Sequence, residues 1–152
     1  PGVEILQSYH DSDNREEAFA NAQAALQAYP EIDVFYATGD HEALAAIEAT
    51  EQAKRLNSRA DGKKIIFVTP DDSKETMAYI DKGILDMDVP LTPLQADIAV
   101  RAMIKIITGE EVPYNVMVPN IPMVTKEGKD IFGFKTQKTD EWYQYTFGPP
   151  IE

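Results

Sequence analysis

The stretch that decides the fold is Val34-Phe35-Tyr36-Ala37-Thr38-Gly39-Asp40-His41-Glu42-Ala43-Leu44. It begins with an unbroken apolar run, which is typical of a strand covered on both faces, as in a parallel sheet. Gly39 then permits a sharp turn, and we expect Asp40 to cap the helix that Ala43 and Leu44 continue. A buried strand that turns directly into a helix leaves a crevice at its carboxyl end, where open α/β sheets bind ligands. The stretch therefore predicts a ligand-binding α/β lobe.

The same strand-helix pattern recurs through the first part of the chain. Strands are also expected at Val3–Leu6 and Ile65–Val68, and helices at Arg15–Tyr29 and at about 40–56. Ser73 is expected to cap a further short helix, which Gly83 closes. Sequential β-α units imply a parallel sheet with right-handed crossovers. The predicted fold class is α/β, an open parallel sheet flanked by helices in a Rossmann-like lobe.

The pattern changes after Gly83. Residues 84–89 alternate apolar and acidic side chains, which predicts a half-exposed edge strand. A proline-rich extended segment follows at 90–93, and a helix is expected over about 94–108. The chain ends in an aromatic tail at 142–147, which favours a packing role over a carbohydrate platform.

The composition is that of about one soluble globular domain, with 152 residues, 43% hydrophobic and 26% charged. The net charge of −12 argues against binding to nucleic acid or to an anionic membrane surface. No apolar run approaches the ~20 residues of a membrane-spanning helix, and no signal-peptide pattern is present. The protein is therefore either cytosolic or exported with its signal removed. The absence of cysteine excludes disulfides, thiolate metal sites and a cysteine nucleophile.

Four blocks of the sequence resemble the carboxyl-terminal half of the periplasmic sugar-binding proteins of ABC transporters, of the ribose-binding type. The first is Asp11–Ala18, and the second is Tyr29–Asp40 with Ala43–Ile47. The third is Ile65–Asp71 with Ile80–Gly83, and the fourth is Gly109–Pro113 with Val116–Pro119 and Val124–Lys126. Each block is weak alone, and their order and spacing make the resemblance specific. It implies two α/β lobes that close on a sugar without transforming it, with no cofactor. It also implies a permease or sensor that recognises the closed form, and a periplasmic location with the signal peptide outside this chain.

The resemblance covers only about half of such a protein. It assigns residues 1–90 to the carboxyl-terminal ligand-binding lobe, 91–135 to hinge crossings and a helix of the other lobe, and 136–152 to an aromatic extension. The crossings are expected near Leu91–Pro93 and Asn120–Pro122. Either the amino-terminal lobe lies in the same protein or in another chain, or it was removed, or these residues form some other assembly. An isolated lobe exposes apolar surface, so we expect this one to associate with other chains.

The resemblance also places ligand contacts after the strands. Asp71 matches an acid that accepts hydrogen bonds from sugar hydroxyls, although it could instead cap the helix that follows Ser73. Thr38 and Gly39 fall where the family has an amide, so that a backbone group or the threonine contacts the ligand, or the turn has no ligand role. Leu91 replaces an amide common at the hinge crossing.

Further contacts are implied in the turn before the first helix. Asp13 occupies the position of an aromatic ring that stacks on the sugar. Either Tyr9 or His10 supplies that ring, or the ligand is more polar or cationic than a simple pentose or hexose. Arg15 matches a family arginine, with a solvated salt bridge as the alternative.

Other classes of site find little support. Asp11 and Asp13 begin like a calcium loop, but the glycine and closing acid that such a loop requires are Glu16 and Ala22. With two histidines and no cysteine, no metal site is predicted. The alternative function is the effector-binding domain of a LacI-type repressor, which shares the fold and would show a helix-turn-helix upstream. An enzyme of doubly wound fold is disfavoured, because no phosphate loop or activated nucleophile is evident.

Overall fold

The fold was analysed in a computed structural model that describes residues 2–10, 13–91, 94–115 and 122–147, with the backbone alone for Leu94 and residues 144–147. The elements are α1 (Arg15–Ala28), β1 (Val34–Tyr36), α2 (Asp40–Gln52), β2 (Ile66–Pro70), α3 (Lys74–Asp81), β3 (Met87–Val89), α4 (Leu94–Ile107), β4 (Met123–Val124), β5 (Thr136–Gln137) and α5 (Thr139–Phe147).

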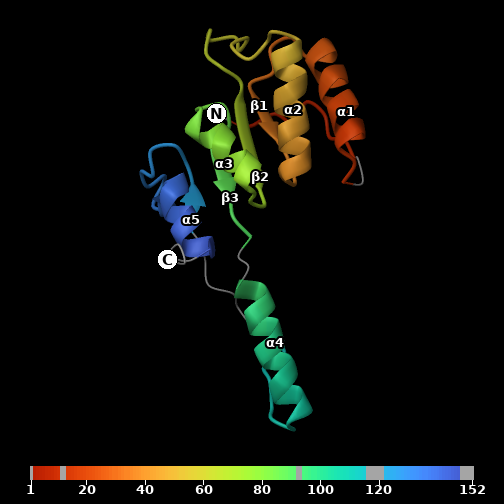
Figure 1. The fold of residues 1–152 in the computed structure, drawn as a ribbon. Helices are drawn as coiled ribbons and strands as arrows, with labels where there is room; N and C mark the ends of the chain where they lie inside the picture. Colours follow the sequence, from red (N-terminus) through yellow and green to blue (C-terminus); the bar gives the residue numbers. More distant parts are fainter. Residues whose placement is uncertain (1, 11–12, 92–93, 116–121, 148–152) are drawn as a thin grey trace.

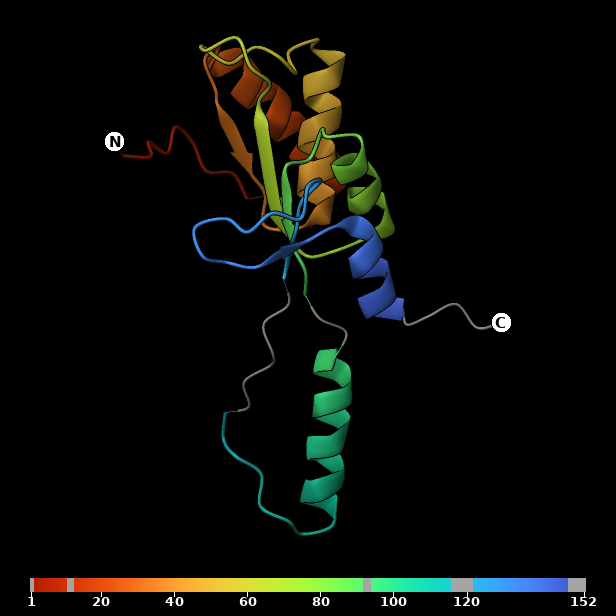
Figure 2. The ribbon, with the colours of Figure 1, turned by 90° about the vertical axis from the view of Figure 1, so that its left-hand side faces the viewer.

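The strands form one sheet in the order β1-β2-β3-β4-β5. β1, β2 and β3 run parallel to one another, β4 is antiparallel to β3, and β5 is parallel to β4. α2 and α3 lie over one face of the sheet, and α1 packs against α2 (Figures 1 and 2). The predicted fold class, an α/β lobe with an open and mostly parallel sheet, is confirmed.

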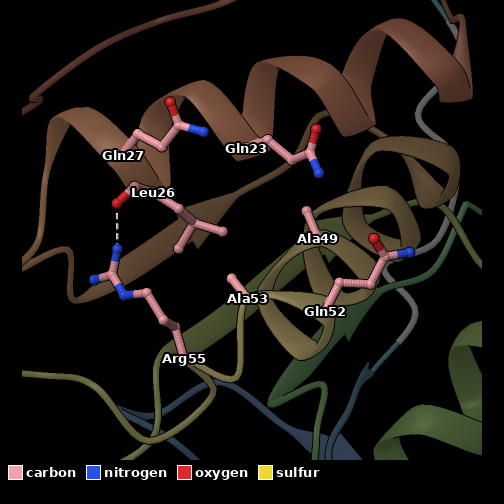
Figure 3. A pocket seen from close by; sticks show the side chains of 7 residues that line it. All are labelled: Gln23, Leu26, Gln27, Ala49, Gln52, Ala53 and Arg55. Atoms are coloured by element: carbon pink, nitrogen blue, oxygen red, sulfur yellow. Dashed lines mark hydrogen bonds between the residues drawn. The ribbon is translucent and has the colours of Figure 1, made fainter.

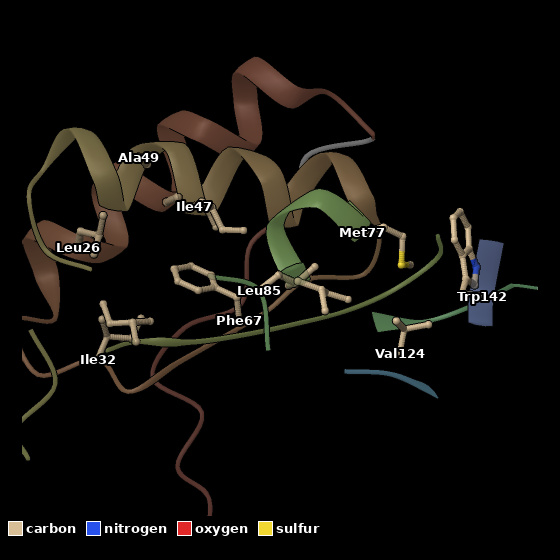
Figure 4. Close-up of a cluster of buried hydrophobic side chains, with 13 residues drawn as sticks. Leu26, Ile32, Ile47, Ala49, Phe67, Met77, Leu85, Val124 and Trp142 are labelled. Carbon is tan, nitrogen blue, oxygen red and sulfur yellow. The ribbon is translucent and has the colours of Figure 1, made fainter. Parts of the chain in front are cut away.

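The core lies between these helices and the sheet (Figure 4). Ile47 and Met77 point from α2 and α3 towards Phe67 of β2, and all three are at most 1% exposed. The rings of Phe35 and Phe67 stack at 5.6 Å between centroids. Trp142 of α5 joins the same core and is 2% exposed, which confirms the packing role expected for this residue of the tail. Each such side chain stabilises the fold by roughly 1.5–3 kcal/mol.

Local sequence signals explain where the helices begin and end. The Asn14 side chain accepts the amide hydrogens of the first turn of α1, at 3.0 and 3.2 Å. Ser73 caps α3 in a reciprocal capping box with Thr76, as the sequence predicts for this serine. Gly83 and Gly109 follow α3 and α4 with φ of +73° and +80°, the left-handed conformation that favours glycine after a helix.

The first strand differs from the prediction. Residues 2–10 form no strand, and Val3 and Ile5 are 95% and 81% exposed. β1 is therefore an edge of the described sheet, and its outward side chains Val34 and Tyr36 are 46% and 70% exposed. The expectation of a strand covered on both faces is wrong, because the helices of the described chain cover only one face.

β3 also differs, since it lies inside the sheet and not at its edge. The chain returns after α4, and β4 pairs with β3 through Val124 opposite Asp88. Neither acidic residue of this segment is a free surface carboxylate: Asp86 accepts hydrogen bonds from the Phe67 amide and from Lys64, and Asp88 is fully buried. Local alternation cannot reveal a pairing that spans such a distance in sequence. α2 ends at Gln52, earlier than predicted, before Lys54 adopts a φ of +55°.

α4 stands apart from the sheet in both views (Figures 1 and 2). Val100, Met103, Ile104 and Ile107 share one face of the helix and are between 49% and 75% exposed. A soluble helix normally buries such a face, so this one is available to a partner. None of the helices in the described part of the chain combines the length and apolar character needed to cross a membrane. The predicted hinge positions Thr92–Pro93 and Asn120–Ile121 lie outside the described residues, and the domain division stays a prediction.

Replacing the cap of α1 tests the local basis of the fold. Asn14→Ala removes the acceptor of the first-turn amides, so we expect the free energy of unfolding to fall by about 1 kcal/mol in urea denaturation. The matched control is Asn57→Ala in the exposed loop after α2, for which a change within about 0.5 kcal/mol is expected. Equal effects of the two substitutions would contradict the capping role.

Candidate ligand-binding site

The carboxyl ends of β1, β2 and β3 lie side by side at one end of the sheet. Backbone hydrogen bonds extend the pairing past the strands, with the Ala37 amide donating to the Val68 carbonyl and the Asp71 amide to the Val89 carbonyl, each at 3.0 Å. The segments that follow the three strands therefore converge. We call them the rim, which consists of residues 38–39, 71–73 and 90–91.

The rim contains several of the residues predicted to contact a ligand. Thr38 and Asp71 are exposed, Gly39 is half-buried and Leu91 is 53% exposed. Asp71 has a φ of +78°, a left-handed conformation that is uncommon for any residue with a side chain. Such conformations cost of order 1–3 kcal/mol and cluster at functional sites. The structure thus brings Thr38, Gly39, Asp71 and Leu91 to the same end of the sheet.

Asp72 holds the rim together. Its Oδ1 accepts the amide hydrogen of Leu91 at 3.2 Å, and its Oδ2 accepts the indole Nε1 hydrogen of Trp142 at 2.5 Å. Burial raises the pKa of Asp72, while the hydrogen bonds from Trp142 and Leu91 lower it and the neighbouring Asp71 raises it. The sequence does not predict this role, because Trp142 lies 70 residues away.

Asp40 is buried beneath the rim. It is the first residue of α2, whose N-cap is Gly39, so the prediction that Asp40 caps this helix is wrong. Its side chain is turned into the protein, with 8% of the residue exposed and Oδ1 without a hydrogen-bond partner in the described structure. Burial raises the pKa of Asp40 to about 6; the Ser73 hydroxyl opposes this shift, and Asp71 and Asp72 add to it.

Asp88 lies deeper, on the same face of the sheet as its strand partner Thr69. It is fully buried, and neither carboxyl oxygen has a hydrogen-bond partner among the described residues. The nearby Thr76 hydroxyl donates its hydrogen to the Ser73 carbonyl at 3.0 Å. Burial raises the pKa of Asp88 to about 8. The Thr76 hydroxyl lowers this pKa, and the negative charges of Asp40, Asp72 and Asp71 raise it further. At pH 7 this pKa keeps the Asp88 carboxyl mostly in its protonated, neutral form.

The turn before α1 is less clearly connected to the rim. Arg15 forms ion pairs with Glu48 of α2 at 3.8 Å and Glu75 of α3 at 3.6 Å, and all three side chains are about half exposed. This geometry fits the salt-bridge alternative and brings Arg15 near the first turn of α3. Asp13 and His10 are exposed, and no hydrogen bond or ion pair joins their side chains to the rim in the described structure.

Other possible sites in the described structure are weaker. No three histidine or acidic side chains within it are placed to hold a metal ion. A pocket lies between α1 and α2, lined in part by Gln23, Gln27 and Gln52 (Figure 3). The Arg55 guanidinium at its end donates to the Leu26 carbonyl, which ties the two helices together. None of the predicted ligand residues lies there.

An open sheet whose parallel strands end at a rim of polar side chains defines an α/β ligand-binding lobe. Residues 1–111 match the family model described as periplasmic binding protein domain, and the chain belongs to that family. This confirms the resemblance drawn from the sequence. No curated protein sequence matches the chain.

Solved structures support the same assignment. A Mycobacterium smegmatis protein in complex with β-D-fucofuranose is 27% identical, with a TM-score of 0.65 over 75% of this chain and 36% of its own. The binding protein of the arabinose ABC transporter from Shewanella sp. ANA-3 is 18% identical, with a TM-score of 0.74 over 93% of this chain and 43% of its own. GanP, a glucose-galactose binding protein from Geobacillus stearothermophilus, is 24% identical, with a TM-score of 0.65 over 75% and 39%. At these identities, the second and third show the fold alone.

The chain spans about two fifths of the length of these structures. The Shewanella and Geobacillus relatives are binding proteins, and the homologues in this family are non-enzymatic, which agrees with the class predicted from the sequence.

The buried carboxyls predict an unusual dependence of stability on pH. The folded protein keeps a proton on Asp88 up to about pH 8, whereas the unfolded chain releases it near the ordinary value of 3.8. The free energy of unfolding should therefore fall as the pH rises from about 4 through 8, and Asp40 contributes in the same direction up to about 6. Asp88→Asn keeps the neutral shape, and urea denaturation should show it to be more stable than the wild type by roughly 2–5 kcal/mol at pH 8.

Near pH 4 the wild type and Asp88→Asn should have similar free energies of unfolding, because both carry a neutral side chain at this position. Two curves that stay parallel across the whole range would show that the Asp88 carboxyl does not titrate as its burial implies.

Proposed function

We propose that this chain supplies the ligand-facing wall of one lobe in a sugar- or polyol-binding protein that serves an ABC transport or sensing system. The observation that carries the proposal is Asp71, an exposed carboxylate in a left-handed conformation where three parallel strands end. Family membership adds the expectation of a periplasmic location, with a signal peptide outside these residues. A permease or sensor would recognise the closed, ligand-bound form.

Asp71 would accept hydrogen bonds from ligand hydroxyls. A hydrogen bond to a charged acceptor contributes about 1.5–3 kcal/mol, more than one between neutral groups. The Asp71 Oδ1 also accepts the Asp72 amide at 3.2 Å, which orients the carboxylate. The Thr38 hydroxyl and the Gly39 backbone follow the neighbouring strand and are the next candidate contacts.

The ligand class is proposed from the relatives, whose names include β-D-fucofuranose, arabinofuranose, glucose and galactose. These are neutral, hydroxyl-rich molecules that a few fixed polar groups can hold. Leu91 offers only its backbone to such a ligand. His10, Asp13 and Arg15 stay predicted contacts, and an acid in place of the stacking ring makes polyols and cationic solutes part of the same test.

The second wall of the site would come from the other lobe. We propose that residues 1–90 belong to this lobe, that 91–135 carry the hinge crossings and place α4 in the other lobe, and that 136–152 are a carboxyl-terminal extension. The exposed apolar face of α4 supports this division, because an intact protein would bury it. The exposed outer face of β1, with Val34 and Tyr36, would likewise be covered by the rest of the protein.

The assignment of Asp71 can be tested by removing its charge. Asparagine tolerates the left-handed conformation, so Asp71→Asn changes the carboxylate with little backbone strain. In calorimetry with L-arabinose, D-fucose, D-galactose and a polyol, we expect any ligand of the full-length protein to bind roughly ten- to a hundredfold more weakly.

The control for this test is Asp33→Asn, at the amino end of β1, where the carboxylate pairs with Arg59 at 3.2 Å. It should leave the affinity unchanged because it lies at the opposite end of the strand from the rim. An Asp71→Asn protein that bound its ligand as well as the wild type would refute the site.

The placement of α4 can be tested with a charge on its apolar face. If the other lobe covers that face, Ile107→Glu should lower the free energy of unfolding of the full-length protein by roughly 3 kcal/mol or more, because it buries an unpaired charge. In the 152-residue chain alone the same change should cost less than about 0.5 kcal/mol, since Ile107 is 75% exposed. Lys105→Glu, off this face, is the control and should be tolerated in both. Equal and small effects of Ile107→Glu in the two proteins would argue against the two-lobe division.

A further inference from the structure

We propose that Asp72 is a positioning residue that couples the ligand rim to the carboxyl-terminal helix α5 through Trp142. The proposal rests on the function proposed above for the rim. It assigns a role to two residues, Asp72 and Trp142, that are not themselves expected to touch the ligand.

One carboxylate makes the connection. Oδ1 of Asp72 accepts from the Leu91 amide at the end of β3, and Oδ2 accepts from the Trp142 indole on α5. The preceding residue, Asp71, is the main candidate contact, and its amide is bonded to the Val89 carbonyl. Asp72 thus fixes the loop that carries Asp71 against two elements at once. Hydrogen bonds to an ionised acceptor are stronger and shorter than neutral ones, so the carboxylate is a stiff link.

The indole end of this link is fixed by packing. Trp142 is 2% exposed and lies beside Met77 and Val124 in the core (Figure 4). The Tyr143 ring meets it edge-on, with 4.8 Å between centroids and 70° between planes. The indole cannot turn away from Asp72 without opening the core. A shift of the Asp72 loop must therefore move α5 with it or break the hydrogen bond.

A second anchor of α5 provides a comparison. The Thr139 hydroxyl donates to Asp81 Oδ1 at 2.6 Å. Asp81 is the last residue of α3, whereas Asp72 lies in the rim, just before the other end of that helix. Both carboxylates hold α5 in place, but of the two only Asp72 also bonds to the rim. Substituting either residue should therefore weaken the docking of α5, whereas only a substitution of Asp72 should affect the rim.

The first test needs no ligand. Trp142 and Leu91 are linked through the Asp72 carboxylate, so a change in one should reach the other. Trp142→Phe keeps the ring in the core and removes the donor. We expect the Leu91 amide to exchange its hydrogen at least tenfold faster by NMR in Trp142→Phe and in Asp72→Ala. Asp81→Ala should leave the exchange of Leu91 as in the wild type.

The second test adds ligand to the full-length protein. The probes are L-arabinose, D-fucose and D-galactose, with affinity from calorimetry and the indole N–H resonance of Trp142 as the spectroscopic signal. Binding should move this resonance in the wild type and in Asp81→Ala. Trp142→Phe and Asp72→Ala should bind about tenfold more weakly, and the indole resonance of Asp72→Ala should no longer respond to the sugar.

The outcomes separate this proposal from the proposed function. If no sugar or polyol binds the wild type, the proposed function fails, and the exchange rates of Leu91 still decide whether the coupling exists. If Trp142→Phe leaves Leu91 exchange as in the wild type, or if Asp81→Ala accelerates it equally, Asp72 does not couple the rim to α5. If a sugar binds the wild type and the indole N–H resonance of Trp142 does not shift, the coupling is likewise refuted.

Discussion

The parallel pairing of β2 with both of its neighbours is the constraint on which the rest of the structure depends. Parallel strands must begin at one end of a sheet and finish at the other, so the turns that follow them meet whatever their sequences are. Here those turns bring a threonine-glycine pair, two consecutive aspartates and a leucine to one place. α2 and α3, which leave from the first two of these turns, cover one face of the sheet and bury Phe67 of the central pair of strands. The geometry of the proposed site therefore follows from the same strand pairing that builds the core.

The electrostatics beneath the rim follow from this arrangement. Asp40 and Asp88 are buried close to Asp71 and Asp72, and a group of four like charges so near one another is unfavourable in a region of low dielectric constant. Burial, together with these neighbouring charges, raises the pKa of Asp40 to about 6 and that of Asp88 to about 8. Near neutral pH, Asp88 therefore mostly keeps its proton, whereas Asp40 is mostly ionised. The more deeply buried of the two acids is the one that stays neutral.

Sequence reasoning succeeded where the cause is local. Ser73 caps α3 and Gly83 follows its end as predicted, because each acts on backbone groups a few residues away. The position of Asp71 after a buried strand was likewise predictable from the run that precedes it.

Reasoning from the sequence failed where distant segments meet. The interior position of β3 depends on β4, and the role of Asp72 depends on a tryptophan near the other end of the chain. A local pattern of alternating acids cannot tell a solvent-facing carboxylate from one buried against a later strand. The exposure of Val34 has a similar origin, since burial of a strand face depends on which elements pack over it.

The open side of β1 affects how this polypeptide has to be handled. In the described sheet, β1 pairs only with β2, so its other side leaves backbone amide and carbonyl groups free to recruit an extended segment. The exposed side chains of Val34 and Tyr36 on the same strand would strengthen such an association through apolar contacts. Two copies that paired through β1 would join their sheets edge to edge, which is the association that natural sheets avoid by covering or blocking such edges. Expressing the polypeptide together with segments that cover β1 should therefore keep it from associating through this edge.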